Sequence, residues 1–79
     1  QLRPLKNRIQ KLEQSLAQLE ADKKQIETRL SAEDIYDAAN KEQLTELLQR
    51  QGAVAAQLEA TEMAWLEASE TLQTLQQSQ

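Results

Sequence analysis

Hydrophobic residues recur along the first part of the chain at steps that alternate between three and four positions. The repeating positions are Leu2, Leu5, Ile9, Leu12, Leu16, Leu19, Lys23, Ile26 and Leu30. A period of 3.5 residues sustained over four heptads is typical of a coiled coil, because it keeps one seam facing a partner helix. The pattern predicts a helix over about residues 3–30, with Pro4 in the first turn, where its missing N–H costs nothing.

Lys23 is the polar member of this first seam. We expect its alkyl stem to lie over the seam while its amine stays in water. The alternative is that Lys23 acts as a polar key, which lowers stability and excludes slipped pairings.

A second seam with the same alternating steps follows after a break. Its members are Leu44, Leu47, Gln51, Val54, Leu58, Thr61, Trp65, Ala68, Leu72 and Leu75. This seam predicts a second helix over about residues 41–76, with Asn40 and Gln43 as an N-terminal capping pair. At a seam position, the Trp65 ring is expected to belong to the core.

Two seams of similar length joined by a short break predict an all-α fold, an antiparallel two-helix coiled-coil hairpin. The favoured register pairs Leu2 with Leu75, Leu12 with Trp65 and Leu30 with Leu47. A register one heptad shorter is the main alternative, and it would place Leu30 against Asn40. Both registers let the chain cover its own hydrophobic seams, so we expect a monomer.

The break at residues 31–40 is expected to cap the open tip of the hairpin with a short helical turn. Ser31 and Asp34 have the spacing of a capping box that starts this turn. Ile35 and Tyr36 would fold back over the tip, which buries the tyrosine ring and leaves its hydroxyl in water. The alternative is that Tyr36 is exposed in a mobile loop.

Composition narrows the classes of function. The 79 residues include no Cys, no His and only two aromatic side chains, so neither nucleophilic catalysis nor a zinc site is expected. No apolar run is long enough to span a membrane, and the lack of Cys fits a cytoplasmic protein. The chain starts at Gln1, so we interpret residues 1–79 as one domain excised from a larger protein.

Charge is unevenly distributed along the chain, although the net charge is −4. Residues 1–12 contain four bases and no acid, namely Arg3, Lys6, Arg8 and Lys11. These side chains are candidates for salt-sensitive contacts with phosphates, and Lys24 and Arg29 extend the positive charge along the same helix. The alternative is that they pair with acids of the returning helix, Glu62, Glu67 and Glu70.

The segment "EMAWLE" around Trp65 has an apolar edge outside the seam, formed by Met63 and Leu66. Such an edge indicates a docking surface for another domain or partner. The alternative is two scattered exposed apolar residues without a role.

Three segments together resemble the C-terminal domain of ABC-F ATPases. They are "RPLKNRIQKLEQSLAQLEADKKQIETRL", "DIYD" and "LTELLQRQGAVAAQLEATEMAWLEASETLQ". The likeness is closest to the YheS-like branch, and the Uup branch is more distant. The resemblance implies a cytoplasmic parent protein that acts on ribosomes and binds ATP in upstream domains, with no cofactor in this part. In the Uup branch this domain is associated with DNA binding, which here would fall on the six basic residues named above.

The resulting hypothesis is a non-catalytic arm of a ribosome-associated ATPase that contacts RNA, DNA, ribosomal protein or its own ATP-binding domains. One alternative is a purely structural or dimerising coiled coil that binds no nucleic acid. Another is a transfer-RNA-binding arm similar to that of seryl-tRNA synthetases.

Overall fold

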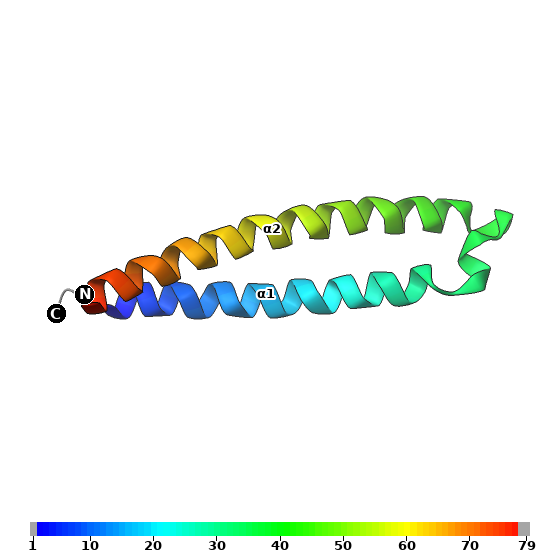
Figure 1. The fold of residues 1–79 in the computed structure, drawn as a ribbon. Helices are drawn as coiled ribbons and strands as arrows, with labels where there is room; N and C mark the ends of the chain where they lie inside the picture. The colour runs from blue at the N-terminus through cyan, green and yellow to red at the C-terminus, as the bar shows by residue number, and fades with distance from the viewer. Residues whose placement is uncertain (1, 78–79) are drawn as a thin grey trace.

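The computed structural model describes residues 2–77, and every regular element in this range is helical. In chain order the elements are α1 (Leu2–Leu30), η1 (Glu33–Tyr36), η2 (Ala38–Asn40) and α2 (Lys41–Gln77), where η denotes a 3₁₀ helix. The prediction of an all-α protein is therefore confirmed. The helices lie side by side along a rod of 62 × 15 × 14 Å, with η1 and η2 at one tip (Figure 1).

The hydrophobic core follows the seam and is densest in the half of the rod that is nearer the tip. Its buried members are Ile26, Ile35, Leu47, Val54 and Leu58. Ala68 is buried further along α2, towards the other end. Because seam positions 3.5 residues apart stay on one side of each helix, burial follows the predicted stripe on both α1 and α2.

Lys23 is exposed, while the next seam residue, Ile26, is only 2% exposed. Lys23 therefore keeps access to solvent between two apolar parts of the seam. This agrees with the expectation that its amine stays in water.

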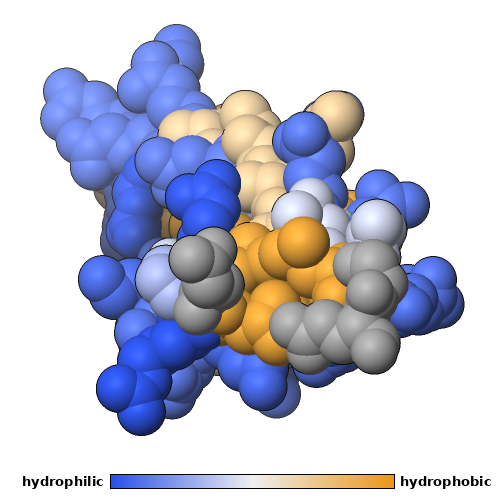
Figure 2. Space-filling view, turned by 90° about the vertical axis from the view of Figure 1, so that its left-hand side faces the viewer, coloured by the Kyte–Doolittle hydropathy of each residue, from blue (hydrophilic) through white to orange (hydrophobic). Residues whose placement is uncertain are grey.

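The far end of the rod carries the first turns of α1 and the last turns of α2. Figure 2 looks onto this end and shows hydrophobic side chains gathered near the centre of the face, with hydrophilic side chains around them. Leu2, Leu5 and Leu72 are half-buried here, and Leu75 is 41% exposed. The seam is thus less completely covered at this end than near the tip.

Of the two residues expected to cover the tip, Ile35 and Tyr36, only Ile35 is buried, which corrects the expectation for Tyr36. Ile35 is fully buried, whereas Tyr36 is 63% exposed. In a 3₁₀ helix consecutive side chains point about 120° apart, so only one of the two can face the seam. The Tyr36 hydroxyl donates a hydrogen bond of 2.7 Å to the carbonyl oxygen of Leu30. Tyr36 therefore satisfies an acceptor in the last turn of α1 rather than burying its ring.

The expected capping box of Ser31 and Asp34 does not form. Ser31 lies before η1 and its hydroxyl donates to the carbonyl oxygen of Thr28 at 2.8 Å, in the last turn of α1. The residue in the N-cap position of η1 is Ala32, which provides no side-chain hydrogen bond. Because the 3₁₀ helix starts two residues after Ser31, the spacing of the capping box does not match the start of the turn.

The amides of Asn40 and Gln43 tie the tip together, in place of the expected pairing of the two as an N-terminal cap. The Asn40 side-chain nitrogen donates to the carbonyl oxygen of Asp34 at 2.6 Å. The Gln43 side-chain oxygen accepts a hydrogen bond from Arg29 at 3.0 Å. Both bonds run between different elements, which a rule for local capping does not anticipate.

Candidate functional site

The four bases Arg3, Lys6, Arg8 and Lys11 lie in the first three turns of α1, and all are exposed. We call them the basic group. Within residues 2–77 the one ion pair joins Arg29 and Asp34. No member of the basic group therefore forms an ion pair with the acids of α2 in the described part of the chain.

The basic group divides into two pairs that flank the seam. Arg3 and Lys6 are three residues apart, as are Arg8 and Lys11, so each pair projects from neighbouring positions of the helix surface. At 100° per residue, the two pairs fall on opposite sides of the stripe that faces α2. Arg8 and Lys11 also line a shallow hollow of about 310 Å³. The arrangement places positive charge on both flanks of α1 at this end of the rod.

Lys24 and Arg29 lie further along α1, and the structure does not bring them to the basic group. Lys24 is exposed and lies 13 residues beyond Lys11, which is about 20 Å along a helix. The two terminal nitrogens of the Arg29 guanidinium each donate a hydrogen bond of 3.0 Å. One goes to a carboxylate oxygen of Asp34 in η1 and the other to the side-chain oxygen of Gln43 in α2. Arg29 therefore joins α1, η1 and α2 through these two bonds.

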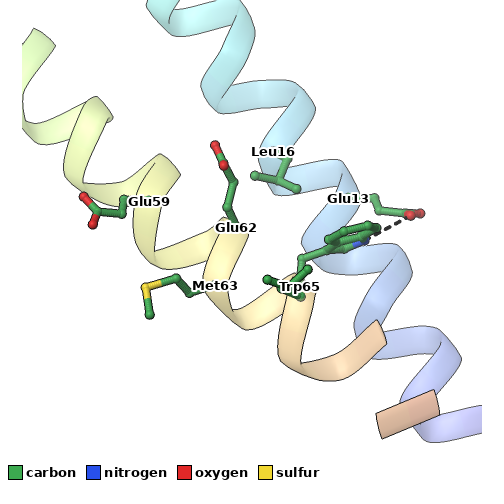
Figure 3. A pocket seen from close by; sticks show the side chains of 7 residues that line it. Glu13, Leu16, Glu59, Glu62, Met63 and Trp65 are labelled. Atoms are coloured by element: carbon green, nitrogen blue, oxygen red, sulfur yellow. Dashed lines mark hydrogen bonds between the residues drawn. The ribbon is translucent and has the colours of Figure 1, made fainter. Parts of the chain in front are cut away.

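A second surface surrounds Trp65, and Figure 3 shows it from close by. The hollow has a volume of about 540 Å³, and we call it the Trp65 groove. Its lining consists of Glu13, Leu16, Glu59, Glu62, Met63, Trp65 and Leu66. The indole N–H donates a hydrogen bond of 3.2 Å to a carboxylate oxygen of Glu13 (Figure 3). The ring of Trp65 is half-buried.

Residues 2–77 bring together no group of three His, Cys, Asp or Glu side chains suited to a metal ion. In the same range, neither α1 nor α2 has a stretch long and apolar enough to cross a membrane. Both surfaces are open and charged, which suits contact with another molecule.

The model of the family described as the ABC transporter C-terminal domain matches residues 3–70 of the chain. The chain belongs to this family. The match spans the basic group and the Trp65 groove alike, so both surfaces lie within the family domain. The resemblance predicted from the sequence is thereby confirmed.

This ABC transporter C-terminal domain is also similar to curated proteins from Escherichia coli. It is 43% identical over 51 residues to the probable ATP-binding protein YheS of strain K12, and equally to YheS of O157:H7. Each alignment covers 65% of this chain and 8% of the relative. The chain thus corresponds to a small part of these relatives. No solved structure shows a significant match to it.

Within this C-terminal domain, the sequence located part of the Trp65 groove and missed the rest. Met63 and Leu66, expected as an apolar docking edge, are 61% and 54% exposed and line the groove. Glu13, Glu59 and Glu62 were not among the predicted site residues. The favoured register pairs Trp65 with Leu12 and so places Glu13 beside the ring, which was the signal available for that residue.

Proposed function

We propose that the chain is the non-catalytic C-terminal coiled-coil arm of a ribosome-associated, cytoplasmic ABC-F ATPase. In this proposal ATP is bound and hydrolysed in other domains of the parent protein. The arm contributes reach and contact: a stiff rod carries the basic group, which contacts phosphates of RNA or DNA. The match to the family domain and the likeness to a probable ATP-binding protein support this parentage.

The proposed architecture is an antiparallel coiled coil in the register that pairs Leu12 with Trp65. One contact supports this register. The bond between Glu13 and Trp65 lies one residue from the expected pair. A shift by one heptad would move the partners of this bond by about 10 Å along the helix.

The observation that carries the proposed nucleic-acid contact is the exposure of four lysine and arginine side chains. The side chains of the basic group are exposed, and none forms an ion pair within residues 2–77. Their charges are thus available to displace counterions from a phosphate backbone. The overall net charge of −4 makes this contact local rather than a general attraction of the whole rod.

Charge reversal of Arg3→Glu together with Lys6→Glu is expected to weaken binding of a labelled RNA or DNA oligonucleotide, measured by fluorescence anisotropy. With four phosphate contacts to a single-stranded oligonucleotide, the affinity of the unchanged protein should fall about 50-fold between about 50 and 200 mM salt, and the double variant should show about half that slope on logarithmic axes. The matched control is Lys41→Glu with Arg50→Glu, which makes the same change of charge on α2.

Three results would contradict the proposed contact: no binding at the lower salt concentration, binding unaffected by the variant, or an equal loss in the control. Absence of binding together with a mass that rises with concentration in sedimentation would favour the dimerising coiled coil instead.

A further inference from the structure

The Trp65 groove combines an exposed apolar floor with an acidic rim. Met63 and Leu66 expose more than half of their surface. By contrast, the seam residues Leu58 and Ala68 of the same helix are buried. The carboxylates of Glu59 and Glu62 project from α2 beside them (Figure 3). Apolar side chains left in water within a hollow mark a surface that gains free energy when it is covered.

We propose that the Trp65 groove is a docking site for a peptide segment of a partner protein, one that carries an apolar side chain flanked by lysine or arginine. The choice of occupant follows from charge. Residues 51–79 contain four glutamates and neither lysine nor arginine. Within residues 2–77 none of the groove carboxylates forms an ion pair. The groove therefore presents uncompensated negative charge around an apolar floor.

The volume of the groove suits a side-chain anchor. A hollow of about 540 Å³ accepts one or two apolar side chains of the partner between Met63 and Leu66. A neighbouring ammonium or guanidinium then lies close to Glu59 and Glu62, and over the face of Trp65 it gains a cation–π contact.

The Trp65 ring is held in place before a partner arrives. Its N–H is bound to Glu13 of α1 at 3.2 Å, and its body is half-buried at the seam. A pre-oriented aromatic ring loses little conformational freedom on binding, which is the property of an anchor residue at a protein interface.

The same features disfavour a nucleic acid in this groove, because its lining would present three carboxylates and no lysine or arginine to the phosphates. The Trp65 groove and the basic group are therefore two separate surfaces, with partners of opposite charge. This inference does not depend on the proposed nucleic-acid contact.

The test uses Trp65 as its own reporter, since it is the chain's only tryptophan. The probe is a synthetic peptide in which leucine and lysine alternate, titrated while the Trp65 fluorescence is followed. We expect saturable binding that weakens about tenfold in the variant Glu59→Gln with Glu62→Gln. The matched control is Glu67→Gln with Glu70→Gln, which makes the same change of charge outside the groove and should leave the affinity within about twofold.

Two further probes separate the apolar and ionic contributions. A peptide with serine in place of leucine, and one with glutamate in place of lysine, are both expected to bind at least about tenfold more weakly. The variant Met63→Ser with Leu66→Ser should weaken the original peptide to a similar extent, and it should leave the circular dichroism spectrum unchanged because both residues are exposed.

Four outcomes would overturn the inference. They are no saturable binding, an equal loss in the groove and control variants, equal binding of the peptide without leucine, and self-association of the protein that the groove variant abolishes. The last would identify a second copy of the chain as the occupant.

Discussion

Replacing Ile35 by alanine is expected to lower the free energy of unfolding by about 3 kcal/mol. The side chain is fully buried in the 3₁₀ turn at the tip and packs into the core that α1 and α2 share. Truncation removes buried methyl groups and leaves a cavity, because the surrounding residues relax only partly to fill it. Urea unfolding followed by circular dichroism measures the change.

Tyr36→Ala is the control for this prediction, because it removes a larger side chain from the adjacent position. Tyr36 is 63% exposed, so the main loss is its hydrogen bond to the carbonyl oxygen of Leu30. We expect a cost of about 1 kcal/mol. A larger loss for Tyr36→Ala than for Ile35→Ala would show that the tyrosine ring closes the tip, contrary to the structure.

Leu47→Ala is expected to destabilise the protein by about 2–4 kcal/mol, since Leu47 is 9% exposed and belongs to the core of the rod. The neighbouring Leu48 is 51% exposed, so Leu48→Ala should change the free energy of unfolding by less than about 1 kcal/mol. Both variants make the same chemical change in the same helix, and helix propensity therefore cancels between them. Thermal and urea unfolding of the two proteins provide the comparison.

Similar losses for Leu47→Ala and Leu48→Ala would contradict the burial pattern along α2. A larger loss for Leu48→Ala would indicate that the helix is rotated, with a different stripe facing α1.

The helices and their buried stripes could be predicted from the sequence because the signal is local and repeated. In α2 each predicted seam position from Leu44 to Leu72 is buried or half-buried. A 3.5-residue period fixes which side of a helix is apolar without knowledge of the partner. Leu75, at the end of the seam, is 41% exposed.

The tip could not be predicted in the same way, because its geometry depends on contacts between elements. The roles of Ile35 and Tyr36 are decided by the rotation of η1 relative to the seam, which the sequence does not specify. From the sequence, Arg29 was interpreted as an extension of the positive charge along the first helix. In the structure its guanidinium donates hydrogen bonds to Asp34 and Gln43. Such a role appears only once residues distant in the sequence are placed together.

The Trp65 groove lies between these two cases. The exposure of Met63 and Leu66 follows from their positions outside the seam, so the sequence could locate the apolar edge. The acidic rim draws Glu13 from α1 and Glu59 from α2. Their proximity depends on the pairing of the two helices, and the charge of the surface therefore needed the structure.

The central claim is that the chain doubles back so that its own two seams cover each other. It is tested most directly by a spin–spin distance between labels at Asn7→Cys and Gln73→Cys, which are unique because the natural chain has no cysteine. The account predicts a distance comparable with the width of the rod, whose short extents are 15 and 14 Å, unchanged when labelled protein is diluted into unlabelled protein. A separation near 100 Å, as in one continuous helix, or a short distance that vanishes on dilution, would contradict it.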